Sequence, residues 1–317
     1  MRLCPRATVV KGTRGEYSKY SRWVTEIIAD KAPLFEKASI DEFYLDLTGM
    51  NKYFNPWQWT IGLRQEIIDK TGLPISFALA SNKMVAKMAT NAAKPNGYMQ
   101  VKAGMEKEFL SPLPVNTIPG IGKQTYQHLL GIGIQTIGDV SLRKQADLEF
   151  LLGSYGQELW NKAQGIHHGA VVPYSEAKSV STENTFETSS NDMDFIMSEL
   201  VRMTERIAYE LRQDDKMAGC IAVKIRYPDF ETTSRQMAIS YTCYDDELIP
   251  AAKVLFHKLY RKGQSVRLLG VKLSELTSEA RQTNLFENTE KKTDLYNAID
   301  AVKGRFGKDA ISRARTI

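Results

Sequence analysis

Two consecutive carboxylates, Asp41 and Glu42, stand immediately before the apolar and aromatic run Phe43-Tyr44-Leu45. The run is typical of a buried strand, and successive side chains of a regular strand point to opposite faces. The two carboxylates can therefore serve one site only if the backbone turns where they stand. We predict such a turn at the tip of a hairpin whose strands are Leu34–Ala38 and Phe43–Leu47.

Paired carboxylates at a hairpin tip are what a two-metal phosphoryl-transfer site needs. Hard cations such as Mg²⁺ take oxygen ligands, and two such ions can hold the attacking and the leaving oxygens of an in-line displacement. The alternative interpretation of Asp41 and Glu42 is an exposed acidic turn without a function. An isolated Asp-Glu pair favours that alternative, so the rest of the chain has to decide between them.

Length and composition bound the class of protein. A chain of 317 residues can hold two or three compact domains, and 43% hydrophobic with 25% charged residues is ordinary for a globular protein. No apolar run approaches the ~20 residues of a membrane span, and Met1–Arg6 has no signal-peptide core. Cys4, Cys220 and Cys243 show no Cys-x-x-Cys spacing, which indicates neither a disulfide framework nor a zinc site. These features predict a cytoplasmic protein without a membrane partner.

The positive charge of the chain is compatible with a polyanionic partner. The net charge is +5 and the pI is near 8.9. Part of the excess lies at residues 303–317, which carry Lys303, Arg305, Lys308, Arg313 and Arg315. We interpret this basic segment as a solvated tail.

The N-terminal part of the chain alternates helix and strand patterns. Apolar residues with a 3.6-residue period indicate amphipathic helices, and Asn55-Pro56 and Gly72 are typical start and stop signals. The order helix–strand–strand–helix–strand–helix predicts an α+β layer. The predicted elements are a helix over 16–31, the hairpin, a helix over 55–72, a strand over 75–80 and a helix over 82–93.

The middle of the chain, from Ser111 to Tyr174, has short helices and many glycines. Its segment Thr117–Lys123 reads Thr-Ile-Pro-Gly-Ile-Gly-Lys and predicts the tight turn of a helix–hairpin–helix, followed by a helix to about Leu130. Such a turn presents backbone N–H groups at a helix N-terminus, where a DNA phosphate can bind without any reading of base sequence.

The C-terminal part follows a linker at about 170–178 and predicts a β-α-β-β-α-β series, in a ferredoxin-like or split βαβ layout. Residues from about Ser278 onward predict a loosely tethered tail. The predicted elements are a strand over 179–187, a helix over 192–213, strands over 218–227 and 235–242, a helix over 246–260 and a strand over 266–275.

These motifs, in this order, resemble the Y-family translesion DNA polymerases, in particular the DinB or DNA polymerase IV branch (ImpB/MucB/SamB). The resemblance covers residues 1 to about 286 and is carried by Ser39–Asp46, Ser81–Gly97 and Thr117–Lys123. It implies an α+β chain of four regions: an incomplete palm at 1–110, a helix–hairpin–helix thumb at 111–174, a β-α-β-β-α-β little finger at 175–277 and a tail at 278–317.

The resemblance also implies roles for individual residues. Asp41 would bridge two Mg²⁺ ions, and Glu42 would complete the site where the primer hydroxyl is activated, so both are catalytic and metal-binding candidates. Lys94, in a Lys-Pro-Asn-Gly stretch, would contact the incoming deoxynucleoside triphosphate. The candidate DNA contacts are Ser81, Lys83, Gly120, Gly122 and Lys123.

A short peptide in the predicted tail resembles the segment by which bacterial polymerases bind the sliding clamp. It reads Gln282-Thr283-Asn284-Leu285-Phe286, with Leu285 and Phe286 as apolar anchors and Gln282 as the polar contact. Short motifs also match by chance. The place of this one, after a little-finger-like region and in a segment of low hydrophobicity, favours clamp binding.

The sequence departs from the family pattern at its beginning. Y-family polymerases begin with a strand that carries another catalytic Asp, followed by a fingers domain. Here Met1–Pro5 falls where the fingers domain ends, and no Asp or Glu precedes Glu16. We therefore expect the first palm strand, its carboxylate and the fingers to be missing from this chain.

The sequence thus predicts a Mg²⁺-dependent, error-prone translesion DNA polymerase that acts as a monomer in DNA repair, although the missing segment calls the activity of this chain into question. Its partners would be primer–template DNA, deoxynucleoside triphosphates and the sliding clamp. Two other classes stay open. A non-catalytic DNA- and clamp-binding remnant would keep the thumb and tail motifs without incorporating nucleotides. A nucleotide cyclase also places carboxylates at a hairpin, but it needs neither the helix–hairpin–helix nor the C-terminal β-α-β-β-α-β unit.

Overall fold

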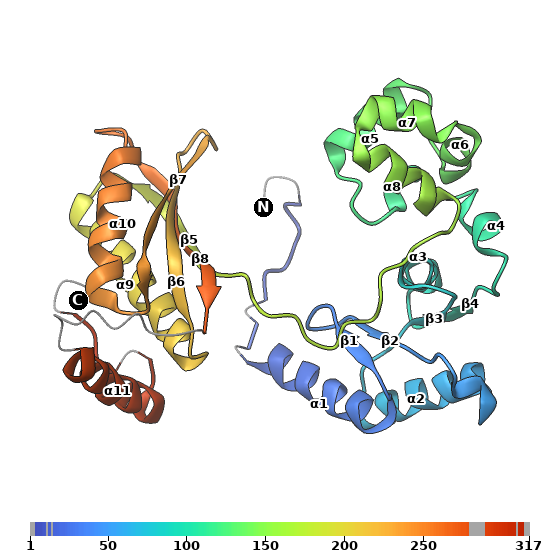
Figure 1. Cartoon of the computed structure of the whole chain (residues 1–317), viewed down its shortest axis with the longest axis horizontal. Helices are drawn as coiled ribbons and strands as arrows, with labels where there is room; N and C mark the ends of the chain where they lie inside the picture. The colour runs from blue at the N-terminus through green and yellow to red at the C-terminus, as the bar shows by residue number, and fades with distance from the viewer. Residues whose placement is uncertain (1–3, 11, 14, 279–288, 309, 314–317) are drawn as a thin grey trace. The chain divides into compact units, whose positions relative to one another are not determined.

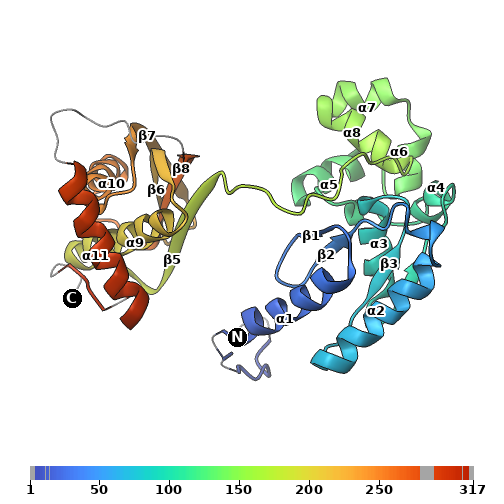
Figure 2. The ribbon, with the colours of Figure 1, turned by 60° about the horizontal axis from the view of Figure 1, so that its bottom comes forward.

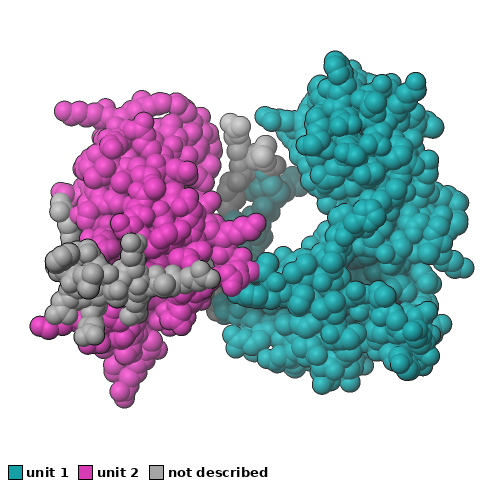
Figure 3. Space-filling model, viewed as in Figure 1, with its two compact units in different colours: residues 1–175 teal, residues 176–317 magenta. Residues whose placement is uncertain are grey.

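The computed structural model describes residues 4–10, 12–13, 15–278, 289–308 and 310–313. The chain divides into two compact units, residues 1–175 and residues 176–317 (Figure 3). Each unit has hydrophobic core clusters of its own. Within the described ranges, the helices are all too short or too polar to cross a membrane.

The first unit begins with two helices packed on a hairpin (Figure 1). The second helix begins and ends as the sequence predicts. The Asn55 side chain accepts hydrogen bonds from the N–H groups of Trp57 and Gln58, and Pro56 occupies a first-turn position, where no N–H is needed. Gly72 ends the helix in the left-handed conformation, with φ 71°. The elements are α1 (Glu16–Lys31), β1 (Phe35–Lys37), β2 (Phe43–Leu45), the 3₁₀ turn η1 (Met50–Lys52) and α2 (Pro56–Thr71).

A parallel strand pair completes the layer. β3 (Phe77–Leu79) pairs with β4 (Tyr98–Gln100), and α3 (Lys83–Ala93) makes the crossover between them. The Asn82 side chain caps α3 by accepting from the Val85 N–H at 3.1 Å. The sequence pattern does not predict β4, which directly follows the turn that ends at Gly97.

Short helices make up the rest of the first unit (Figure 2). Their buried side chains share one core with the apolar face of α3. The predicted helix after the glycine-rich turn is confirmed as α5. The elements are α4 (Glu106–Leu110), the 3₁₀ turn η2 (Val115–Thr117), α5 (Lys123–Gly131), α6 (Ile137–Leu142), α7 (Gln145–Leu152) and α8 (Ser154–Ala163).

The second unit is a four-stranded antiparallel sheet with two helices packed on one face (Figure 1). The predicted element order β-α-β-β-α-β is confirmed. The elements are β5 (Ser179–Ser190), α9 (Met193–Gln213), β6 (Met217–Arg226), β7 (Thr232–Thr242), α10 (Asp245–Leu259) and β8 (Val266–Thr277).

The strand order of this sheet is β5-β8-β6-β7, so the ferredoxin-like prediction is wrong. In a ferredoxin-like sheet the third strand lies between the first two, whereas here the fourth strand, β8, takes that place and β7 lies at the edge. The side chains explain the difference. Most residues of β6 are buried, whereas β7 is rich in Thr, Ser and Gln and largely exposed. An apolar strand is more stable inside a sheet and a polar one at its edge.

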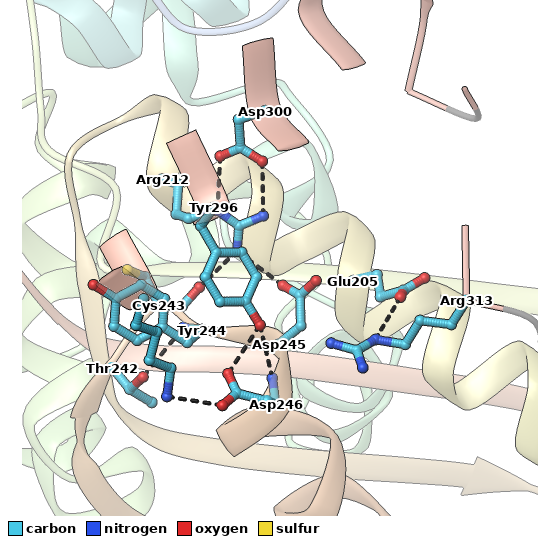
Figure 4. A network of polar contacts seen from close by, with 11 residues as sticks. Glu205, Arg212, Thr242, Cys243, Tyr244, Asp245, Asp246, Tyr296, Asp300 and Arg313 are labelled. Carbon is cyan, nitrogen blue, oxygen red and sulfur yellow. Dashed lines mark hydrogen bonds and ion pairs between the residues drawn. The ribbon is translucent and has the colours of Figure 1, made fainter. Parts of the chain in front are cut away.

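The segment predicted as a loose tail contains a long helix, α11 (Thr289–Phe306), so that prediction is wrong for these residues. Arg212 of α9 donates to both carboxylate oxygens of Asp300 on α11, at 2.7 and 3.0 Å, and to Asp245 at 2.8 Å (Figure 4). Tyr296 of α11 is buried and donates to the Asp246 carboxylate at 2.8 Å. Charged and hydroxyl groups thus hold α11 in place, whereas most of its regularly spaced apolar side chains are exposed.

The basic residues at the end of the chain also have partners in the second unit. Lys303 is buried beside the ring of Tyr209, Lys308 lies 3.4 Å from Glu210, and Arg313 lies 2.9 Å from Glu205 (Figure 4). The interpretation as a solvated tail is therefore wrong for Lys303, whereas Arg305, Lys308 and Arg313 are exposed. Arg315 lies outside the described residues.

Candidate active site

The two carboxylates stand at the tip of the β1–β2 hairpin, as the sequence predicts. The N–H groups of Ala38 and Ser39 both donate to the Glu42 carbonyl, at 2.9 and 3.2 Å. Asp41 Oδ1 accepts from the Ser39 hydroxyl at 2.5 Å, and its side chain is exposed. The backbone therefore turns where the acids stand, so the opposite orientation imposed by a regular strand does not apply.

Helix α3 directs two lysines toward this hairpin. Lys83 and Lys87 are four residues apart and so lie on one face of the helix. The Lys83 ammonium is 2.5 Å from Glu36 on β1, and the Lys87 ammonium pairs with Glu42. One helix face thus supplies a positive charge to each of two hairpin carboxylates.

Glu36 also ties the end of the first unit to the hairpin. Its carboxylate accepts from the Val172 N–H at 2.8 Å, and Lys83 donates to the Ala170 carbonyl at 3.0 Å. Burial by itself would raise the pKa of Glu36, but the hydrogen bonds from Lys83 and Val172 outweigh it and hold that pKa below its usual value. Glu36 is therefore ionised at neutral pH.

Tyr44 on β2 lies in the field of the same acids. Burial raises the pKa of its phenol, and the negative charges of Glu42 and Glu36 raise it further. The Lys83 ammonium lies 4.9 Å from the centre of the ring. The phenol therefore stays protonated at neutral pH and can act there only as a neutral hydrogen-bonding group.

The turn that contains Lys94 is held by Arg64 of α2. The Arg64 guanidinium donates to the carbonyl of Asn96 at 3.0 Å, to its side-chain oxygen at 2.6 Å, and to the Ile75 carbonyl at 2.8 Å. Gly97 is required at the end of the turn, because a Cβ there would lie 2.2 Å from the Ala93 carbonyl oxygen. The hydrogen bonds from Arg64 and the lack of space at Gly97 together fix the backbone conformation of this turn.

Lys94 itself is exposed at the C-terminal end of α3. It follows Lys87 by seven residues, which on an α-helix brings it back to nearly the same face. Lys83, Lys87 and Lys94 thus form a line of positive charges along α3. The first two meet hairpin carboxylates, and the third faces solvent.

The Thr117–Lys123 turn precedes α5. Gly120 has φ 99°, a conformation that favours glycine. Gly122 is the N-cap of α5 and brings no side chain to the first N–H groups of the helix. Lys123 is exposed directly beside them. Free N–H groups, the positive end of a helix and a lysine together favour an anion.

Asp41 and Glu42 fit a hard divalent cation in the chemistry of their oxygens. The Lys87 ammonium pairs with Glu42, so this carboxylate already binds one positive charge. Within the ranges that the structure describes, no three or more His, Cys, Asp or Glu side chains gather into a metal-binding group. The described residues therefore offer such an ion a pair of ligands.

The sequence candidates fall into two groups within the first unit. The first group lies on the hairpin, on α3 and in the segments just before and after α3, and the second forms the turn before α5. Gln282, Leu285 and Phe286 lie outside the described residues. Sequence reasoning missed Lys87, whose spacing of four from Lys83 was the available signal, and Arg64, for which the sequence gives none. The first group is Asp41, Glu42, Ser81, Lys83 and Lys94, and the second is Gly120, Gly122 and Lys123.

Comparison with known proteins gives consistent matches along the chain. Residues 1–91 match the impB/mucB/samB family and residues 177–285 match the impB/mucB/samB family C-terminal domain. DNA polymerase IV of Dehalococcoides mccartyi is 34% identical over 317 residues, which cover 99% of this chain and 81% of that protein. DNA polymerase IV of Caulobacter vibrioides is 32% identical over 325 residues, which cover 100% and 80%.

Solved structures agree with these matches. A Y-family DNA polymerase chimera, Dbh-Dpo4-Dbh, has a TM-score of 0.78 and 26% identity over 88% of this chain and 81% of that chain. An insertion ternary complex of Dbh DNA polymerase has a TM-score of 0.58 and 25% identity over 86% and 80%.

The mixed α/β fold shared with these structures, together with the DNA polymerase IV relatives, defines a DNA-directed DNA polymerase of the Y family. Within that class, the chain belongs to the impB/mucB/samB family. The resemblance inferred from the sequence is confirmed.

Proposed function

We propose that this chain carries out Mg²⁺-dependent nucleotidyl transfer at the tip of the β1–β2 hairpin, in error-prone synthesis across damaged DNA. The observation that carries the proposal is the turn that places Asp41 and Glu42 next to each other at the hairpin tip. Membership of the family supports DNA synthesis as the reaction. The translesion role follows from the resemblance of the motifs to those polymerases.

In this proposal the hairpin carboxylates bind the metal ions and the lysines along α3 bind the triphosphate. Asp41 and Glu42 would hold the divalent ions, which supply charge neutralisation for the triphosphate and a lower pKa for the primer hydroxyl. Lys87 would leave Glu42 as the ions bind. Lys94 stands seven residues further along, a rise of about 10 Å on a helix. The two ammonium groups would then bind and orient the triphosphate of the incoming nucleotide.

The Thr117–Lys123 turn would bind a phosphate of the primer–template backbone. The uncapped N–H groups of α5 and the exposed Lys123 support this role, and such contacts read charge and shape rather than bases. In the terms of the family, residues 111–174 would be the thumb and residues 175–277 the little finger. Binding should be sequence-independent, with a log–log salt slope of roughly −0.9 per phosphate neutralised.

We also propose that the peptide at 282–286 binds the sliding clamp, with Gln282 as the polar contact. The sequence of the peptide supports this proposal. Apolar anchors of such interfaces typically cost about 2 kcal/mol or more each when truncated. Leu285→Ala combined with Phe286→Ala should therefore abolish clamp pull-down and leave DNA binding intact. Unchanged clamp affinity in the double variant would sink the idea.

Primer extension by the 317-residue chain tests the catalytic proposal. Asp41→Ala and Glu42→Ala should each lower Mg²⁺-dependent extension by about 100-fold or more, because misplacing the reacting groups by ~1 Å has that effect. Asp30→Ala is the matched control: this acid is 75% exposed at the end of α1, and its loss should leave extension unchanged. Extension that survives Asp41→Ala would refute the assignment.

A non-catalytic DNA- and clamp-binding role is the second candidate. The Lys87–Glu42 pair favours it, because that pair neutralises one of the two candidate metal ligands. This role predicts that the parent chain binds primer–template DNA but extends no primer under any divalent ion. Binding without extension in the parent would select this candidate, and Asp41-dependent extension would exclude it.

A further inference from the structure

Lys162 of α8 lies beneath the Thr117–Lys123 turn and is only 8% exposed. Its ammonium donates to the Pro119 carbonyl at 3.2 Å. It pairs with Glu158, one helical turn earlier, at 2.7 Å. One of the three N–H donors of this nearly buried lysine thus binds a carbonyl within the turn.

The Lys162 ammonium reaches the turn beside Gly120, a residue without a side chain. A Cβ added to Gly120 would lie 3.8 Å from both Lys162 Nζ and Tyr155 Oη. The Tyr155 hydroxyl is buried and has no hydrogen-bond partner among the described residues. The inner surface of the turn at Gly120 therefore faces an ammonium and a neutral hydroxyl.

The charge of Lys162 is only partly balanced by its partner. Glu158 is its ion-pair partner within the described part of the chain, and that side chain is 58% exposed, so water screens much of the carboxylate charge. The field of Lys162 also reaches His167: burial lowers the pKa of that imidazole, and the charges of Lys162 and Lys83 lower it further. A surplus of positive charge therefore remains under the turn.

We infer that Lys162 is a positioning residue for DNA binding: it holds the Pro119 carbonyl inward and places a positive charge behind the N–H groups at Gly120–Lys123, so that this turn accepts a backbone phosphate. An inward carbonyl removes a negative dipole from the outer face of the turn. The charge behind the turn strengthens the attraction already given by the helix N-terminus. The inference rests on the proposed phosphate contact of the turn.

A purely structural lysine would not need its charge. Its methylene stem could pack equally well as an apolar side chain of the same length, and an apolar residue would avoid the desolvation cost of a buried ammonium. The choice of Lys162→Met follows from this comparison, because methionine keeps the stem and removes only the ammonium. Lys162→Arg restores a positive charge at the same place.

Fluorescence anisotropy with a labelled primer–template duplex, at several salt concentrations, tests the inference without relying on catalysis. Lys162→Met should raise the Kd about fivefold, and Lys162→Arg should stay within twofold of the parent. Glu158→Gln should lower the Kd, because it removes the one carboxylate beside the ammonium. Lys144→Met, which removes an exposed lysine at the N-cap of α7, is the control for loss of one charge.

Lys123→Ala separates this inference from the proposal beneath it. If Lys123→Ala weakens binding and Lys162→Met does not, Lys162 has no role and the phosphate contact stands. If neither variant changes the Kd, the phosphate contact of the turn is itself wrong. A loss in Lys162→Met that Lys162→Arg fails to restore, or an equal loss in Glu158→Gln, would overturn the electrostatic role in favour of a structural one.

Discussion

The Lys87 ammonium pairs with the Glu42 carboxylate that the proposed divalent ion would need. Lys87 and Glu42 have side chains that are 25% and 36% exposed, so solvent weakens their attraction but does not remove it. Any ion that binds Glu42 must displace this ammonium or lie close to it, and both cost free energy. Removing the ammonium should therefore strengthen ion binding.

We predict that Lys87→Met binds Mn²⁺ severalfold more tightly than the parent chain, as measured by electron paramagnetic resonance of the free ion. Lys83→Met is the control, since Lys83 pairs with Glu36 rather than with Glu42. Weaker binding in Lys87→Met would mean that the ammonium orients Glu42 for the ion instead of competing with it.

The candidate site could be predicted only as far as it is local in sequence. Asp41 and Glu42 directly precede the strand pattern of β2, so a stretch of seven or eight residues sufficed to predict the hairpin. Lys87 meets Glu42 across 45 residues, and Arg64 meets Asn96 across 32. Long-range ion pairs and hydrogen bonds leave no periodic pattern in the sequence, because helix faces in general carry lysines and arginines.

The buried hydroxyl of Tyr155 should cost stability, because it lost water on burial and gained no partner among the described residues. We predict that Tyr155→Phe raises the free energy of unfolding by up to about 1 kcal/mol in urea titrations. Tyr227→Phe is the matched contrast, since that hydroxyl accepts from the Arg261 N–H at 3.0 Å and donates to the Leu259 carbonyl at 3.2 Å. Tyr227→Phe should lower the free energy of unfolding by about 1 kcal/mol. Equal effects of the two variants would contradict this account.

At the scale of elements, the periodicity of apolar residues predicted which helices and strands exist better than it predicted how they assemble. The six elements predicted for the second unit appear in the expected order, yet the position of β7 at the edge depends on how polar it is relative to β6. The packing of helix α11 escaped prediction because polar contacts through Arg212 and Tyr296 hold it, while its apolar residues Leu295, Val302 and Phe306 are exposed. Both errors come from interactions between elements that are distant in sequence.

The start of α6 gives a prediction on pH. Asp139 accepts from the N–H groups of Thr136 and Gln135, at 2.8 and 2.9 Å, and these bonds hold its pKa below the usual 3.8. A lowered pKa in the folded state stabilises the fold above pH 3.8, and this contribution is lost as the pH falls through the folded-state pKa.

Asp139→Asn should therefore lower the free energy of unfolding by up to about 1 kcal/mol at pH 7. Urea titrations of both proteins between pH 7 and pH 2 provide the measurement. The difference between them should shrink below the ordinary Asp pKa. A difference that is constant down to pH 2 would show that the ionised carboxylate contributes nothing to the cap.

At the scale of the whole molecule, the hydrophobic clusters do not cross from one unit to the other. One cluster lies entirely within residues 176–317, and the other two lie within residues 1–175. Compact units that share no hydrophobic cluster can unfold as separate cooperative systems. We therefore expect calorimetry to resolve two transitions, and a substitution inside one core to move only one of them.

Arg212 offers the sharpest test of this separation. Its side chain is 7% exposed, and its partners Asp245 and Asp300 are 6% and 10% exposed. Arg212→Met would leave two nearly buried carboxylates without their cation, which typically costs about 3–5 kcal/mol. The transition of the second unit should fall by roughly 10 °C or more, and that of the first unit should not move. Arg206→Met, on the same helix but 56% exposed, should shift neither transition by more than a degree or two. A parallel fall of both transitions in Arg212→Met would show that the two units unfold as one.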